Sequence, residues 1–343
     1  MAPPSRLEGF REGRGWGRIP PVLLHGGGRN LNSMKKMASK RKIKTYYKYT
    51  KFHHEPGQTD YLRDFHLRIS LPKTLNDPFE GSINNDLERK LLERIRPEFH
   101  GLHALMPYMP MNKIMELMEN NYRVSKDIIG TISLSESPSN LLMWAHYANE
   151  HNGICIGFKN DFLEKNIAIK DSATALKPIR VHYSTTRPNE ILYTDDPMYD
   201  LNTQMIDHIT NKSIEWEHEQ EHRCIISPKQ AERIKILWPS ENDNQIYSLI
   251  KENNMNKIGE NLYEGEGIES ISANFSESKN LAFLKRISPS SISSIYFGCR
   301  FPKEQKDIII KEINENKDQL NHISIYECTA SKYEFKLDIE KIR

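Results

Sequence analysis

The sequence is poor in the features that mark secreted, membrane-spanning and small metal-stabilised proteins. Only four of the 343 residues are cysteines, and no two are close enough in sequence for a CxxC metal pair. Each cysteine lies in an apolar, strand-like run, so we expect buried free thiols, which fit a reducing compartment. No apolar run approaches the roughly 20 residues of a membrane-spanning helix, and the N-terminus lacks the apolar centre of a secretion signal. The sequence therefore predicts a cytoplasmic protein that does not enter a membrane.

An excess of one charge is also missing. The 48 Lys and Arg residues nearly balance the 46 Asp and Glu residues, which leaves a net charge of +2. Bulk charge therefore identifies no partner, and binding to nucleic acid would need a local basic patch. Hydrophobic residues make up 37% and charged residues 27% of the chain, which is the composition of a globular protein and not of a disordered one.

The first 44 residues differ from the rest of the chain. They are rich in Arg, Gly, Pro and Lys and show little periodicity, so we predict a flexible basic leader, with Met1, Met34 and Met37 as alternative natural starts. Residues 45–343 are predicted to form a single domain. Residues 228–280 are polar and weakly helical, and they are predicted to be a loop-rich insertion within it.

Strand-like and helix-like stretches alternate irregularly after Thr45. Strands are predicted at 46–49, 66–70, 130–135, 154–158, 179–183, 221–226, 292–298 and 323–328. Helices are predicted at 61–65, 87–95, 112–120, 139–153, 199–216 and 303–315, and in the helix at 139–153 we expect Leu142, Ala145 and Ala148 to form the apolar side. There is no regular βαβ repeat and no GxGxxG turn. The pattern therefore predicts an α+β fold, with mixed, largely antiparallel central sheets and helices packed around them.

Two separated segments carry more polar groups than packing requires. Asn76 and Asp77 precede Pro78, which predicts an extended turn. This turn is either purely structural, with side chains bonded to its own backbone, or a loop that contacts a ligand. The segment 144–153 places His146, Tyr147 and His151 on or after a helix, where they either pack as aromatics or form the wall of a site.

The third segment, 212–223, allows two incompatible structures. On a helix, His218 and His222 would share one face as zinc ligands with Glu219 as the base, as in the HExxH motif of zinc hydrolases. On a strand, Glu219, Glu221 and Arg223 would point into one cavity. The apolar run that begins at position 224 favours the strand. A structural ion-pair cluster remains a further alternative for the same charges.

Together these segments resemble the prokaryotic family of domain of unknown function 2971. The matching pieces follow one another in the family's order: 47–49, 67–80 ending in Asn-Asp-Pro-Phe-Glu, 144–147, 151–158, 181–183, the set Lys212, Trp216, Glu219, Glu221 and Arg223, and 292–298. The leader and residues 228–280 lie outside this pattern. His218 and His222 fall between the residues that match, which favours a coincidental zinc motif.

The resemblance implies a layout similar to ADP-ribosyltransferases, especially toxin-like enzymes that modify nucleic acid. Tyr49 or Lys48 would then hold NAD, and Glu221 would orient the ribose and stabilise positive charge as nicotinamide leaves. Glu219 would activate the acceptor, which is a nucleic acid or a protein. The remaining residues expected to contact NAD are Asn76, Asp77, His146, Tyr147 and Arg223. The sequence shows no serine-threonine-serine strand of the kind that this layout places between the two halves of the site.

Three functions therefore follow from the sequence. The first is an NAD-dependent ADP-ribosyltransferase-like enzyme, as a component of prokaryotic defence or a toxin. The second is a non-enzymatic sensor or interaction module in which the cluster of Glu219, Glu221 and Arg223 is structural. The third is a zinc-dependent hydrolase that uses His218 and His222.

Overall fold

The computed structural model describes residues 43–52, 65–80, 129–165, 175–188, 204–240, 243–275 and 278–343, with a few single positions between 87 and 167. Nearly all of the predicted leader lies outside the described residues. The same is true of most of the helices predicted at 61–65, 87–95 and 112–120.

The larger sheet has eight strands in the order β15-β14-β13-β4-β1-β3-β8-β5. Along the chain these are β1 (Thr45–Thr50), β3 (Gly130–Ser135), β4 (Ile154–Lys159), β5 (Ala175–Arg180), β8 (Glu221–Ile226), β13 (Ile292–Phe297), β14 (Ser324–Ala330) and β15 (Leu337–Lys341). All neighbours are antiparallel except β13 and β14, which are parallel. Strands that are far apart in sequence, β1, β3 and β8, therefore lie next to one another at the centre of the sheet.

The smaller sheet has five antiparallel strands in the order β10-β11-β9-β12-β2. They are β2 (His66–Ile69), β9 (Arg233–Ile236), β10 (Asn256–Gly259), β11 (Leu262–Glu264) and β12 (Leu281–Arg286). A separate parallel pair is formed by β6 (His182–Ser184) and β7 (Asn211–Ser213).

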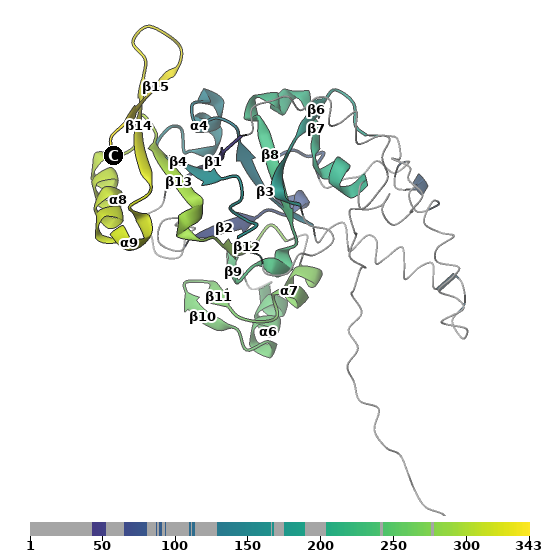
Figure 1. The fold of residues 1–343 in the computed structure, drawn as a ribbon. Helices are drawn as coiled ribbons and strands as arrows, with labels where there is room; N and C mark the ends of the chain where they lie inside the picture. Colours follow the sequence, from purple (N-terminus) through teal and green to yellow (C-terminus); the bar gives the residue numbers. More distant parts are fainter. Residues whose placement is uncertain are drawn as a thin grey trace, which may run out of the picture.

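The helices lie at different places around the two sheets (Figure 1). They are α4 (Leu141–Tyr147), α6 (Asn244–Glu252), α7 (Ile268–Asn274), α8 (Lys303–Glu315) and α9 (Lys317–Leu320), with 3-10 turns η1 (Pro72–Thr74), η2 (Ile214–Glu219), η3 (Pro228–Gln230) and η5 (Pro289–Ser291). In Figure 1, α8 and α9 lie beside β13 and β14, whereas α6 and α7 lie beside the smaller sheet. No helix in the described part of the chain is both long and apolar enough to span a bilayer.

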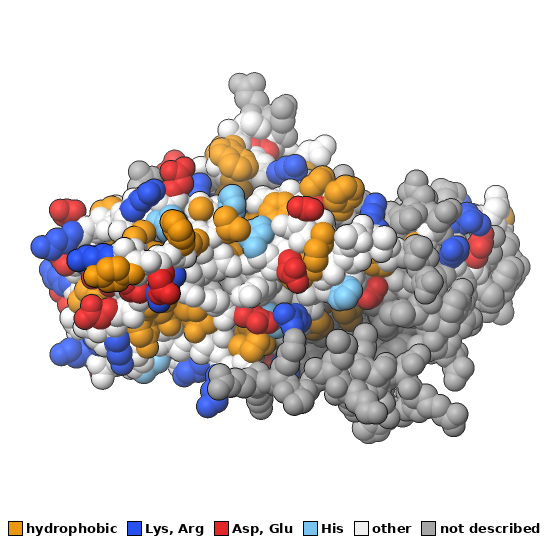
Figure 2. All heavy atoms as spheres, turned by 90° about the horizontal axis from the view of Figure 1, so that it is seen from above, with side chains coloured by type: hydrophobic (Ala, Val, Ile, Leu, Met, Phe, Trp, Pro, Cys, Tyr) orange, Lys and Arg blue, Asp and Glu red, His pale blue; other side chains and the backbone are white. Residues whose placement is uncertain are grey.

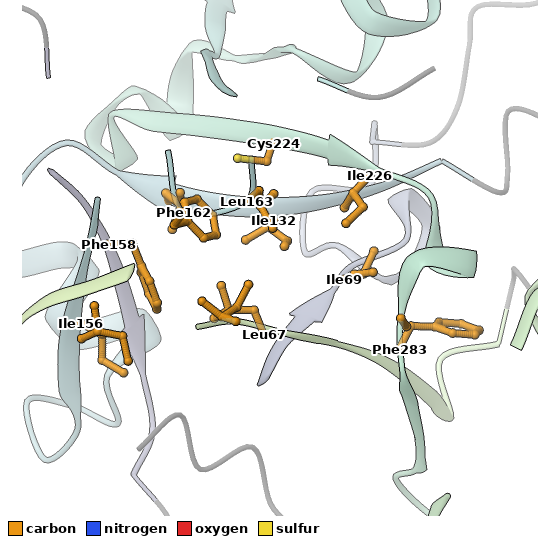
Figure 3. Packing of buried hydrophobic residues seen from close by; sticks show 14 of the residues in the cluster. Leu67, Ile69, Ile132, Ile156, Phe158, Phe162, Leu163, Cys224, Ile226 and Phe283 are labelled. Atoms are coloured by element: carbon orange, nitrogen blue, oxygen red, sulfur yellow. The ribbon is translucent and has the colours of Figure 1, made fainter. Parts of the chain in front are cut away.

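A single hydrophobic cluster joins the two sheets. Figure 3 shows Leu67 and Ile69 of β2 directed toward Ile132 of β3 and Ile226 of β8. These side chains are at most 1% exposed, and burial of their apolar surface is the main force that holds the sheets together. Backbone hydrogen bonds in both directions between Ser70 and Thr131, each of 2.8 Å, add a second link.

The α+β fold with mixed, mostly antiparallel sheets is therefore confirmed. The strand predictions at 46–49, 130–135, 154–158 and 221–226 coincide with β1, β3, β4 and β8. Their alternating or continuous apolar residues are the signal for strands that are buried on one or both faces.

The predicted apolar side of the helix at 139–153 was wrong in part. The helix spans only Leu141–Tyr147, and Ala148 after it is buried as expected, whereas Leu142 is 48% exposed and Met143 and Trp144 are buried instead. The helix begins after Asn140, whose side chain accepts hydrogen bonds from the N–H groups of residues 142 and 143.

Two other segments hold strands that the sequence did not indicate. The helix predicted at 199–216 covers only 204–209 of the described residues, and the chain then forms β7 and η2. Residues 228–280 contain β9, β10 and β11 as well as α6 and α7, so they have more regular structure than the predicted loop-rich segment. The strands of this segment are short, and their apolar residues are packed only after they pair with β12.

Candidate functional site

A cavity of about 560 Å³ lies against the central strands of the larger sheet. Its walls come from β1, β3, the start of β8, α4 and the turn after η1. Residues 237–238, which follow β9 of the smaller sheet, also line it. Seven of the nine residues predicted for the site line it: Lys48, Tyr49, Asn76, Tyr147, Glu219, Glu221 and Arg223. The sequence segments that were expected to meet are therefore brought together.

The strand register sets the floor of the cavity. Tyr47 of β1 is paired with Ser135 of β3, and Ser135 is paired with Glu221 of β8. Ser133 is paired with Arg223 in the same way. Paired residues in antiparallel strands project from the same face. An aromatic group, a hydroxyl group and a charged group therefore lie side by side across three adjacent strands.

Arg223 is the centre of the charged cluster and is only 1% exposed. Its guanidinium group donates two hydrogen bonds to the Glu221 carboxylate, of 2.7 Å from Nε and 2.8 Å from Nη2. Nη1 donates to the carbonyl oxygen of Ile209 at 2.6 Å, and Nη2 also donates to Glu80. This two-pronged geometry is specific to arginine and fixes the carboxylate of Glu221 in orientation.

Lys212 is the second cation of the cluster. Its Nζ lies 2.7 Å from Glu219, 3.3 Å from Glu221 and 3.4 Å from Glu80. The ammonium group also lies 4.7 Å from the centre of the Trp216 ring, a favourable cation–π distance. Three buried carboxylates therefore share two buried cations.

Burial and neighbouring charges shift the pKa values of the groups in this cavity in different directions. Burial alone would raise the pKa of Glu221, but Arg223 and Lys212 outweigh it and lower that pKa to about 2. The pKa of Glu80 is raised because burial outweighs the same two cations. Burial lowers the pKa of Lys48 to about 8, although Glu221 and Glu219 oppose the shift. The cavity thus holds a firmly ionised carboxylate beside a lysine that loses its proton near physiological pH.

Glu219 is held from three sides. Lys212 binds one carboxylate oxygen, the hydroxyl of Tyr147 donates to the other, and the hydroxyl of Ser135 donates to the Glu219 carbonyl group at 2.8 Å. Gln220 then adopts a left-handed backbone conformation, with φ of 47°, which ends η2 and starts β8. Burial and Glu219 together raise the pKa of Tyr147, so its hydroxyl stays protonated and remains a donor.

The strand alternative for residues 221–224 is confirmed, and the helical one is wrong. Glu221 and Arg223 face the cavity, whereas His222 lies 4.8 Å from the ring of Tyr46 and Cys224 lies in the core. Glu219 reaches the cavity from the end of η2, and not from the strand as expected. Because η2 and β8 divide this segment, His218 and His222 do not share a helical face. Within the described residues, no group of three His, Cys, Asp or Glu side chains is arranged to hold a metal ion.

Two predicted residues lie outside the cavity lining. His146 is exposed on α4, with its ring 6.4 Å from Tyr147 and 6.2 Å from His218. Asp77 is 2% exposed and accepts a hydrogen bond of 2.9 Å from the N–H of Phe79. The N–H of Glu80 donates to the Asp77 carbonyl group at 3.1 Å, and this turn directs the Glu80 side chain into the cluster.

Many lining residues were not assigned to the site from the sequence. Five polar or aromatic ones among them bear on the argument: Glu80, Lys212, Ser133, Ser135 and Trp238. Glu80 and Lys212 belonged to segments already singled out, and the two serines alternate along a predicted strand, so a signal existed for four of the five. The serines lie on β3, between β1 and β8, where the sequence had shown no serine-threonine-serine strand.

Comparison with known proteins finds one relationship. The sequence model of the family described as "Protein of unknown function (DUF2971)" matches residues 143–224. This match supports the resemblance to the family of domain of unknown function 2971. The matched segment contains α4, Tyr147, Lys212, Glu219 and most of β8, and hence much of the cavity wall. No curated protein and no solved structure matches the chain.

Proposed function

We propose that the cavity binds NAD and transfers its ADP-ribose group to an acceptor. The observation that carries this proposal is the row across β1, β3 and β8, in which aromatic and lysine side chains, two serines and the Glu221 carboxylate line one cavity in that order, with the Glu219 carboxylate added from the end of η2. This is the arrangement that the resemblance to ADP-ribosyltransferases implies. The likeness is one of layout, so the argument for the activity rests on the chemistry of the individual residues.

The reaction needs a negative charge where the ribose becomes cationic. The bond between ribose C1′ and the nicotinamide nitrogen breaks, and its electron pair leaves with nicotinamide. Glu221 has a pKa of about 2 and is therefore ionised at neutral pH. Its negative charge stabilises the resulting oxocarbenium character electrostatically. Arg223 holds this carboxylate in place, so little reorganisation is needed as the charge develops.

Glu219 completes the transfer. Its carboxylate takes the proton of the acceptor hydroxyl or amine as that group forms the new bond to C1′. Lys212 and Tyr147 orient the carboxylate and act as positioning residues. Lys48, positively charged below its pKa of about 8, supplies a cation for the NAD diphosphate.

The acceptor is a nucleic acid or a protein. On the face seen in Figure 2, Lys and Arg side chains are interspersed with Asp and Glu, and no broad field of one sign is visible. Such a face gives no electrostatic preference for nucleic acid, so both acceptor classes belong in the test.

The test is incubation of the protein with adenine-labelled NAD, cell extract and nucleic acid, compared with Glu219→Gln and Glu221→Gln. We expect label transfer by the wild type and a loss of at least about a hundredfold in each variant, because each removes a group with a role in the transition state. Glu219→Gln is the cleaner variant. It retains an oxygen that can accept a hydrogen bond from Tyr147. Glu221→Gln weakens the hydrogen bonds from Arg223, so its stability must be measured in parallel by unfolding.

The matched control is Glu232→Gln. Glu232 also binds a buried lysine, Lys285 of β12, but it lies just before β9 and does not line the cavity. This variant should lose some stability and keep full activity. Equal activity of Glu219→Gln and wild type, with both proteins folded, would refute the proposal.

A second candidate function is a non-enzymatic interaction module. It is favoured by the pairing within the cluster, where each of the three carboxylates is bound by a cation, as in a purely structural ion network. In that case neither label transfer nor nicotinamide release would occur, and the variants would differ from wild type only in stability.

A further inference from the structure

Trp238 combines exposure with a place on the cavity wall. The cavity is lined by Glu219 and Glu221, which are 3% and 4% exposed, and also by Trp238, which is 69% exposed. The lining therefore includes a buried, charged part and a solvent-exposed part, here called the open end, that carries an indole ring. Trp238 follows β9 and lies in the segment outside the family's pattern, so neither the resemblance nor the family match assigns it a role.

The backbone under this indole is firmly anchored. The N–H of Trp238 donates to the side-chain oxygen of Asn280 at 2.6 Å, and the N–H of Leu237 donates to the Asn280 carbonyl group at 2.8 Å. The amide nitrogen of Asn280 in turn donates to Asp243 at 2.9 Å, and Asp243 is 7% exposed. The exposed ring is thus presented on a fixed support, which reduces the entropy that a ligand would lose on stacking against it.

A large apolar ring at the open end of a polar cavity suits the flat face of a nucleobase. Bases stack on aromatic side chains whatever their hydrogen-bonding pattern, and this contact contributes substantially to binding. Lys48 and Lys51 also line the cavity. They supply positive charge for the phosphates that a nucleotide carries next to its base.

We propose that Trp238 stacks on the adenine ring of NAD. This inference rests on the proposed function, in which the bond between ribose and nicotinamide must lie at Glu219 and Glu221. The adenine is the opposite end of NAD, so it falls at the open end of the cavity. Trp238 therefore contributes to binding of the adenine end of NAD more than to the chemical step.

The first experiment uses AMP, which contains the adenine but no bond that the enzyme could break. AMP should quench the tryptophan fluorescence of the wild type, and Trp238→Phe should lose that quenching although Trp16, Trp144 and Trp216 remain. Ribose 5-phosphate, which has no ring to stack, should cause no quenching in either protein. Quenching of equal size in wild type and Trp238→Phe would overturn the proposal.

The second experiment measures NAD kinetics. Trp238→Ala should raise KM for NAD about tenfold with kcat within about twofold, and Trp238→Phe should restore KM to within about threefold of wild type. Phe335→Ala is the control, because Phe335 is a fully exposed aromatic that does not line the cavity. An increase in KM for the acceptor with no change for NAD would overturn the adenine assignment but leave the transferase proposal intact. Quenching by AMP in a protein that never turns over NAD would support the adenine assignment and overturn the transferase proposal.

Discussion

At the scale of single residues, Lys48 makes the clearest prediction about pH. Burial lowers its pKa from 10.5 to about 8, so the folded protein releases this proton at a lower pH than the unfolded chain does. Between about pH 8 and 10.5 the unfolded state binds more protons, and stability from this group therefore rises with pH. Urea unfolding from pH 7 to 10 should show this rise in the wild type relative to Lys48→Met. A difference between the two proteins that does not change with pH would contradict the assignment.

Arg223 predicts a loss of stability that lysine cannot prevent. Its guanidinium group binds Glu221 twice and also binds Glu80 and the Ile209 carbonyl group. A lysine keeps the charge but lacks the planar, forked set of N–H donors of the guanidinium group. Arg223→Lys should therefore lower the free energy of unfolding by about 3 kcal/mol. Lys306→Met is the comparison, since it removes a pair with the half-exposed Glu327 and should cost less than about 1 kcal/mol. Equal losses in the two variants, measured by urea titration, would show that the arginine fork is not the cause.

Residue patterns revealed part of the site and not the rest. The apolar run that begins at position 224 favoured a strand, and a strand's period of two then predicted that Glu221 and Arg223 share a face. The same logic could not predict that Glu80 would reach Arg223 across 143 positions of sequence. Trp238 was missed for a different reason. Exposure of a single aromatic is decided by which elements cover it, and no local pattern carries that information.

At the scale of elements, the junction between α4 and the sheet depends on a glycine without room for a side chain. A Cβ atom on Gly298, just after β13, would lie 2.1 Å from the carbonyl oxygen of His151. The backbone N–H groups of residues 298 and 300 also bond to the loop that contains His151. Gly298→Ala should therefore destabilise the protein by about 2–3 kcal/mol, because backbone must move away from backbone.

The control for this prediction is Gly259→Ala in β10. There the nearest atoms to a new Cβ lie at 3.5 and 3.6 Å, which is ordinary contact, so the change should stay within about 0.5 kcal/mol. Thermal unfolding of the two variants side by side tests the close approach at Gly298. Similar melting temperatures for both would refute it.

Element prediction succeeded where a strand is buried and failed where a strand depends on its neighbours. The alternation at 130–135 and the apolar run at 154–158 indicate β3 and β4 without reference to the rest of the chain. Strands β9, β10 and β11 are only 3–4 residues long, too short to show a period. They are formed because they pair with one another and with β12, which is a tertiary effect that overrides weak local preference.

At the scale of the whole molecule, the two sheets should unfold together. Leu67 of β2 is buried in the cluster that also contains Ile132 of β3 and Ile234 of β9, and the cavity takes residues from both sides of this contact. Leu67→Ala should therefore lower the stability of both sheets by the same amount, about 2–5 kcal/mol.

Native-state hydrogen exchange can measure the two sheets separately. The amides of Ile132 and Cys224 report on the larger sheet, and those of Ile234 and Phe283 report on the smaller one. Under conditions where exchange follows global opening, all four should give one free energy in the wild type and one lower value in Leu67→Ala. If only the amides of the smaller sheet became less protected, the sheets would be separate cooperative units. The prediction of one domain from residue 45 to 343 would then be wrong, and Trp238 would belong to a part of the protein that can open independently of the carboxylates.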